Sequence, residues 1–120
     1  IRVVREKDSF VDRLNITMVA LNKDDRPVGH IQLIEDERCP GFRDVGPWLG
    51  GLYVDPAHRL RGIAAQLSYT MMRRAVALNY DAIYAFTSNM DRILQHHHFD
   101  QIGTIEYNGK EHRVYRKQLI

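Results

Sequence analysis

At residues 54–64 the sequence reads Val-Asp-Pro-Ala-His-Arg-Leu-Arg-Gly-Ile-Ala, which is typical of a strand that turns at Pro56 into a helix. The backbone N–H groups in the first turn of such a helix have no partners within it and carry the positive end of its dipole. Arg59 and Arg61 add positive charge, and Gly62 leaves room for a ligand to approach. Together these features predict an anion site suited to a pyrophosphate.

A second interpretation of residues 54–64 is a helix N-terminus with exposed arginines and no ligand. The residues themselves do not distinguish this interpretation from an anion site, because the spacing of their glycine and basic residues differs from that of well-known phosphate loops. It is neither the Gly-x-x-x-x-Gly-Lys-Ser/Thr loop of nucleotide triphosphatases nor Gly-x-Gly-x-x-Gly. Evidence for a ligand therefore has to come from the flanking elements.

The segment that follows is predicted to be a helix over residues 62–78, with Asn79 as a left-handed cap at its end. Its apolar residues recur every four positions, as expected for one buried face. These residues are Ile63, Leu67, Met71 and Ala75. A strand at residues 82–87 completes a strand–helix–strand unit, which implies a parallel pair of strands with a right-handed crossover.

The remaining segments predict a mixed α/β sheet. Strands are expected at residues 16–21, 28–34, 48–54, 102–107 and 112–119, and a short helix at residues 89–97. Asn108-Gly109 joins the last two strands as a hairpin turn. Gly50-Gly51 lies inside the central strand, where glycine marks either a bulge or tight backbone packing. Both interpretations of that pair stay open.

Composition fits one compact domain spanning residues 1–120. With 44% hydrophobic and 27% charged residues the chain is an ordinary globular sequence, and no apolar run approaches the roughly 18 residues of a membrane span. The net charge of +2 argues against general nucleic-acid binding. Cys39 is the single cysteine, so no internal disulfide can form, and we expect it to be a loop thiol without a role in a cytoplasmic protein.

At residues 54–64 the pattern Val-x-Pro-x-x-Arg-x-x-Gly-x-Ala resembles the coenzyme A motif of the GNAT superfamily of N-acetyltransferases. Pro47-Trp48-Leu49 before this strand, Phe86-Thr87 at the end of the next and Tyr107-Asn108-Gly109 near the C-terminus are similar to one branch of that superfamily. About residues 16–120 fit the pattern. The resemblance implies a mostly antiparallel twisted sheet with helices on its faces and a parallel pair of strands flanking the cofactor site.

The resemblance also implies a reaction, the direct transfer of an acetyl group from acetyl-coenzyme A to an amine of a small molecule or protein, without a metal. A backbone N–H in a bulged strand would stabilise the oxyanion that develops in the transition state. The residues that the resemblance assigns to the cofactor are Leu52, Tyr53, Val54, Arg59, Leu60, Arg61, Gly62, Ile63, Ala64, Thr87 and Asn89.

Two departures from the family pattern affect the prediction. GNAT domains start with a strand and two helices, whereas residues 1–15 could only be a remnant of that helical region, with weak helical character at residues 10–14. The tyrosine that protonates the leaving thiolate in many members corresponds to Leu94, and the glycine that follows it corresponds to His98. Either the sequence is truncated or a partner chain supplies the missing wall, and a homodimer is left open.

The base that must deprotonate the amine is predicted after the second strand. Glu35 and Asp36 are the candidates, with His30 within the strand as another. A solvated loop is the alternative for each carboxylate, and the resemblance favours Asp36, because related sequences carry an acid there. Tyr53 is the candidate for protonating the thiolate.

The run His96-His97-His98 suggests a metal site, but consecutive helical residues point about 100° apart and cannot converge on one ion. We expect a solvated helix end with one histidine packed inward.

For the whole chain, an acetyl-coenzyme A module without catalysis is the alternative to an enzyme. Nucleic-acid binding by surface arginines is a third hypothesis, with Arg59, Arg61, Arg73 and Arg74 as its residues.

Overall fold

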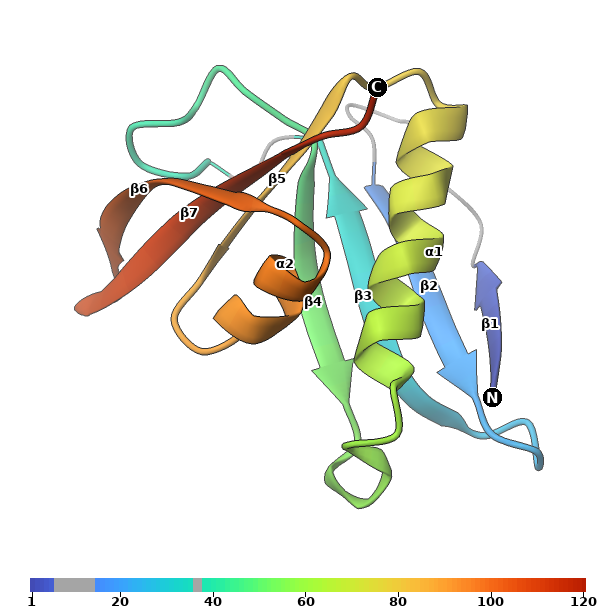
Figure 1. Ribbon diagram of the computed structural model, residues 1–120. Helices are drawn as coiled ribbons and strands as arrows, with labels where there is room; N and C mark the ends of the chain where they lie inside the picture. Colours follow the sequence, from blue (N-terminus) through green and yellow to red (C-terminus); the bar gives the residue numbers. More distant parts are fainter. Residues whose placement is uncertain (6–14, 36–37) are drawn as a thin grey trace.

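One sheet organises the described residues in the order β1-β2-β3-β4-β5-β7-β6 (Figure 1). The structure is a computed structural model and describes residues 1–5, 15–35 and 38–120. The strands are β1 (Arg2–Arg5), β2 (Asn15–Leu21), β3 (Pro27–Ile34), β4 (Trp48–Val54), β5 (Ala82–Thr87), β6 (Asp100–Tyr107) and β7 (Lys110–Gln118). Neighbouring strands pair antiparallel except β4 and β5, which are parallel. The mixed, mostly antiparallel sheet is thus confirmed.

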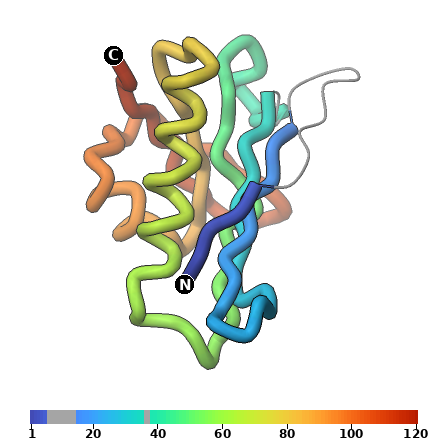
Figure 2. The backbone as a smooth tube through the Cα atoms, turned by 90° about the vertical axis from the view of Figure 1, so that its right-hand side faces the viewer, coloured from blue at the N-terminus to red at the C-terminus, as the bar shows by residue number. Residues whose placement is uncertain are grey.

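Both helices, α1 (Ile63–Ala77) and α2 (Asp91–His96), lie on the same side of the sheet, as the two perpendicular views show (Figures 1 and 2). Their apolar side chains join one buried cluster with the inward residues of β2, β3 and β5. The predicted stripe of α1 supplies its centre: Ile63, Leu67, Met71 and Ala75 are all buried. In the described part of the chain, neither helix has the length and hydropathy to cross a bilayer.

A second, smaller cluster lies on the opposite face of the sheet around Trp48, which is fully buried. The Trp48 indole N–H donates to the Val45 carbonyl at 2.8 Å. Val114 of β7 packs in the same cluster, and so does Cys39, which is only 1% exposed. Cys39 thus lies in a loop, as expected, and its side chain is buried in this cluster.

The helix and strand boundaries agree with the sequence prediction to within two residues at each end, and Asn79 takes the predicted left-handed conformation (φ 68°). Two elements were not predicted. Pro56–His58 form a single turn of 3₁₀ helix, and residues 2–5 form β1, which pairs with β2. Part of the expected helical remnant at residues 1–15 is thus a strand. The weak helical pattern at residues 10–14 lies outside the described residues.

Close approach of β3, β4 and α1 depends on Gly29. A Cβ atom there would lie 2.9 Å from the Tyr53 carbonyl oxygen and 3.2 Å from Leu67 Cδ1. Because the nearest atom belongs to the backbone, we expect Gly29→Ala to lower the free energy of unfolding by roughly 3 kcal/mol, measured by urea denaturation. Gly41→Ala is the control, since open space surrounds its Cβ and only its left-handed φ of 80° opposes the change. Equal losses in the two variants would contradict this packing argument.

Candidate functional site

A bulge distorts the central strand β4 at Gly51. His30 of β3 lies opposite Tyr53 and Gln32 opposite Gly50, so two residues of β4 face one residue of β3. Gly51 has a left-handed φ of 60°, and a Cβ there would lie 2.8 Å from Gln32 Oε1. Both interpretations of the glycine pair therefore hold at Gly51, because the backbone bulges and the Gln32 side chain packs directly over it.

The parallel strands β4 and β5 part soon after they meet. Trp48 and Tyr84 form the only registered pair between them in the described chain, supported by Tyr84 N–H donating to the Pro47 carbonyl at 2.9 Å. Beyond this point a pocket of about 260 Å³ opens between the strands. It is lined by residues 49–52 of β4, residues 85–90 of β5 and its following turn, and side chains from α1, α2, β3 and β7.

This pocket runs through the sheet. Ser68 of α1 and Leu94 of α2 line it from the helix side. Phe86 and His112 line it too, and their ring contacts place them with Trp48 on the opposite side. Two reactants could therefore reach the bulge from opposite faces of the sheet.

A second pocket, of about 590 Å³, lies at the N-terminus of α1. Gln66 N–H donates to the Gly62 carbonyl at 3.0 Å, which leaves the N–H groups of residues 63–65 as first-turn groups without a helical acceptor. Gly62 has φ 78°, and nothing lies within 4 Å of its Cβ position, so the space above these groups is open. Leu60 is also left-handed and fully exposed. This is the predicted anion site.

Side-chain contacts fix the loop that precedes α1. Arg59 Nε donates to the Val54 carbonyl at 2.9 Å, and its guanidinium lies 5.7 Å from the centre of the Tyr53 ring. That ring stacks on His30 at 5.8 Å. His58 Nδ1 bonds Asp55 Oδ2 at 2.8 Å. These contacts restrain the loop between β4 and α1.

The two pockets adjoin. Leu52, Asn89, Met90 and Ile93 line both of them. An extended ligand with an anionic end at α1 could therefore reach the bulge of β4 with its other end.

Comparison with known proteins identifies the family. The sequence profile of the acetyltransferase (GNAT) family matches residues 3–118. The chain belongs to the GNAT acetyltransferase family. No curated protein has a significant sequence match to it.

Solved structures share the GNAT fold at low sequence identity. An aminoglycoside 6'-N-acetyltransferase complexed with coenzyme A superimposes with a TM-score of 0.73 and 17% identity, covering 88% of this chain and 73% of that one. An N-acetyltransferase from Staphylococcus aureus Mu50 gives 0.74 and 22%, with 88% and 68% covered. Mutant forms of the spermidine/spermine N-acetyltransferase from Vibrio cholerae give 0.71 and 17%, with 91% and 69% covered.

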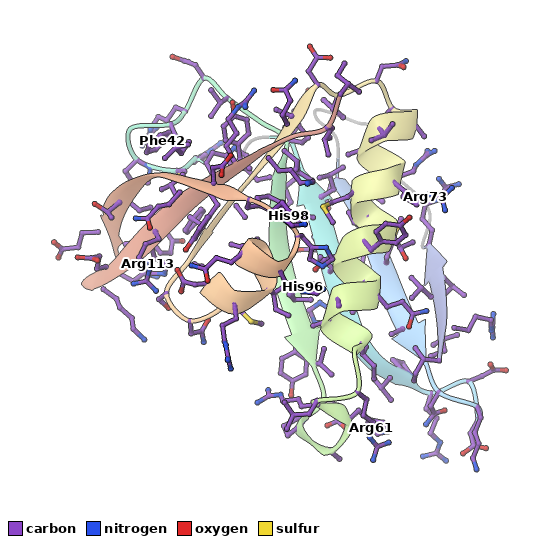
Figure 3. All side chains as sticks on the ribbon, in the orientation of Figure 1. Phe42, Arg61, Arg73, His96, His98 and Arg113 are labelled. Atoms are coloured by element: carbon purple, nitrogen blue, oxygen red, sulfur yellow. The ribbon has the colours of Figure 1, made fainter. Side chains whose placement is uncertain are left out.

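Most residues predicted to hold the cofactor line one of the two pockets. Those at the α1 pocket are Leu52, Tyr53, Val54, Arg59, Leu60, Gly62, Ile63, Ala64 and Asn89. Arg61 does not line either pocket; it is exposed in the loop at the lower end of α1 (Figure 3). Thr87 lines the pocket at the bulge, and its hydroxyl accepts the Asn89 and Met90 N–H groups at 3.2 and 2.8 Å. Thr87 thus also shapes the turn after β5.

Of the predicted catalytic residues that the structure describes, Tyr53 lines a pocket and Glu35 does not. Asp36 lies outside the described residues. Glu35 is exposed at the end of β3 and does not line either pocket; its charge raises the pKa of Tyr80, although burial is the larger cause of that shift. Tyr53 is 44% exposed and lines the anion-site pocket rather than the pocket at the bulge. Their catalytic roles stay predictions.

The two residues that depart from the family pattern, Leu94 and His98, lie in α2 and just after it. Leu94, at the tyrosine position, is buried in the main core. His98, at the glycine position, takes the left-handed conformation (φ 64°), which glycine adopts readily. His97 packs inward as expected, and burial, then the charges of His96, Lys117 and His98, lower its pKa. Within residues 1–5, 15–35 and 38–120, no cluster of three potential metal ligands is found.

A charged clamp between α2 and β7, made by Asp91, Arg113 and Tyr115, was not predicted from the sequence. Arg113 donates to both oxygens of Asp91 at 2.9 and 2.6 Å and to the Ser88 carbonyl at 2.9 Å (Figure 3 labels Arg113). The Tyr115 hydroxyl donates to Asp91 at 2.6 Å. The clamp restrains residues 88–91, and of these Asn89 and Met90 line both pockets. Alternation along β7 could have put Arg113 and Tyr115 on one face, but not opposite Asp91, 22 residues away in sequence.

Chiefly through its hydrogen bonds to Arg113, the clamp lowers the pKa of Asp91 from 3.8 to about 2. Because the folded-state pKa is the lower one, this stabilisation is complete above pH 3.8 and is lost as the pH falls through about 2. We expect Asp91→Asn to lower the free energy of unfolding by roughly 2 kcal/mol at pH 7, a loss that shrinks below pH 4.

Urea denaturation at several pH values measures this effect. Asp100→Asn, at an exposed position on β6, serves as the control and should change stability by less than about 0.5 kcal/mol. A loss in Asp91→Asn that stays constant between pH 7 and pH 2 would contradict a charge-based clamp.

Proposed function

We propose that this GNAT protein is an N-acetyltransferase that transfers the acetyl group of acetyl-coenzyme A to a primary amine by direct attack. The observation that carries the proposal is the continuity between an anion site at a helix N-terminus and a pocket where two parallel strands part at a bulge. An extended cosubstrate with phosphates at one end and a thioester at the other matches that shape.

The residues fit the phosphate end of acetyl-coenzyme A. Residues 63–65 offer N–H groups without helical acceptors, and Gly62 leaves the space above them open. A side chain at Gly62 would project into that space from a left-handed backbone. Arg59 supplies a positive charge at the rim, held by Val54 and Tyr53.

The edge of β4 fits the pantetheine and acetyl end. From Leu49 onward β4 has no registered partner in β5, so its backbone groups on that edge are available to amide groups of a ligand. The bulge at Gly51 turns the backbone at the point where the pocket crosses the sheet. An N–H directed there would polarise the thioester carbonyl and stabilise the oxyanion, an effect of about 3 kcal/mol in other acyl transfers.

A non-catalytic acetyl-coenzyme A module is the second candidate. It is favoured by Leu94, a buried side chain without a proton to donate at the position of the family's tyrosine. The two candidates agree on ligand binding and differ on turnover, so each of them needs its own experiment.

Binding is tested by thermal denaturation with acetyl-coenzyme A. At about 100 times its dissociation constant, the ligand should raise the melting temperature of the wild type by roughly 10 °C. Gly62→Glu places a carboxylate at the anion site and should abolish the shift. Gly109→Glu is the matched control, because Gly109 has a similar φ of 73° and open surroundings in the distant β6–β7 turn. No wild-type shift at millimolar ligand would overturn the binding site.

Turnover is tested by release of free thiol with a panel of amines. We expect the wild type to release coenzyme A above the amine-free background, with Gly62→Glu losing most of this activity because it lacks the cosubstrate. The panel should include an amino sugar, a polyamine, an arylalkyl amine and a peptide with a free N-terminus. Binding without thiol release for every amine would favour the non-catalytic module.

A further inference from the structure

His112 of β7 is the only ionisable side chain among the described residues that line the pocket at the bulge. It is half-buried and lies on the face of the sheet opposite the helices. Glu111 and Arg113 alternate with it and point to the other face, where Arg113 is held by Asp91. No sequence pattern singles out His112, because it is one of six histidines and lies outside every motif.

The orientation of the His112 ring fixes its tautomer. Nδ1 lies 2.9 Å from the Lys110 carbonyl oxygen, which can only accept a hydrogen bond. Nδ1 therefore carries the hydrogen, and in the neutral ring Nε2 keeps its lone pair. Within the described chain no hydrogen bond engages Nε2. An imidazole held this way is ready to accept a proton.

Aromatic rings surround the imidazole. The rings of Phe86 and Tyr107 each lie 5.6 Å from it, edge to face, and 5.4 Å from each other. Phe86 lines the pocket, and Tyr107 is 42% exposed. Tyr107 is the titratable group in ring contact with His112. An ammonium group arriving on this face would be attracted to the ring faces, and an apolar substituent could pack on them.

We propose that His112 Nε2 is the proton acceptor for the acceptor amine, and that Phe86, Tyr107 and His112 form the seat of a primary amine with an arylalkyl or alkyl substituent. This inference rests on the proposed acetyltransferase function and assigns its base and substrate class. The amine enters from the face of the sheet opposite the helices, while the cosubstrate lies along β4 and α1.

The proton balance of the reaction defines the role. Nε2 takes one proton from the ammonium group, which frees the nitrogen lone pair to attack the thioester carbon. The nitrogen loses a second proton as the C–N bond forms, and the C–S bond breaks with its electron pair on sulfur. The thiolate takes up one proton, and the other leaves to solvent, so the amide and the free thiol are formed with one net proton released.

The test is His112→Gln, which keeps side-chain hydrogen bonding but cannot accept a proton at neutral pH. With an arylalkyl monoamine such as phenethylamine, we expect kcat at pH 7 to fall about 100-fold or more. KM for acetyl-coenzyme A and the thermal shift with it should stay at wild-type values, which also shows that the variant is folded. The deficit should shrink as the pH rises and free amine becomes abundant. His96→Gln, at the exposed end of α2, is the control and should match the wild type.

Tyr107→Leu tests the aromatic seat separately and keeps the proposal open to refutation if His112→Gln does not fold. It should raise KM for phenethylamine at least threefold, with kcat and KM for acetyl-coenzyme A nearly unchanged. An active wild type whose His112→Gln variant keeps kcat within threefold at all pH values would overturn the base assignment and leave Glu35, Asp36 and His30 as its candidates. An unchanged amine KM in Tyr107→Leu would overturn the seat. A wild type that binds acetyl-coenzyme A but turns over no amine would overturn the proposed function as well.

Discussion

The parting of β4 from β5 after one registered pair is the constraint on which the site depends. A fully paired parallel sheet would bury its backbone groups in hydrogen bonds and leave no passage between its faces. Here Trp48 and Tyr84 hold the strands together at one end, and the bulge at Gly51 turns β4 where the strands are apart. The pocket, the free strand edge and access from both faces all follow from this separation.

Packed side chains flank the site on both faces of the sheet. On the helix side, the main core holds α1 and α2 against the sheet, and the Asp91–Arg113 pair ties the turn after β5 to β7. On the other side, Trp48 and Val114 anchor the strands beneath the loop that carries Cys39. A reaction that needs two reactants aligned at one carbonyl benefits from such fixed walls.

The two faces of the sheet differ in the side chains that they present to the pocket, and this difference bears on the leucine at the position of the family's tyrosine. Leu94 faces the pocket from the helix side, where a cosubstrate would lie, and brings no proton there. Ionisable chemistry is instead concentrated on the far side, at His112 and its aromatic neighbours. In the proposed mechanism, the amine therefore loses its proton on the face of the sheet opposite Leu94.

Local sequence determined most of the elements and predicted the anion site. Periodicity located α1, Asn79 ended it, and Pro56 through Gly62 indicated a phosphate-binding helix start, because these signals act within a few residues of one another. Strand β1 was not predicted, because four residues of an edge strand are defined only by their pairing with β2. Glu35 and Asp36 were selected as candidate bases by residue type. His112, in contrast, lies at the pocket because β7 pairs with β5. Only the tertiary structure could decide that, because proximity across a sheet depends on strand order and register rather than on any local pattern.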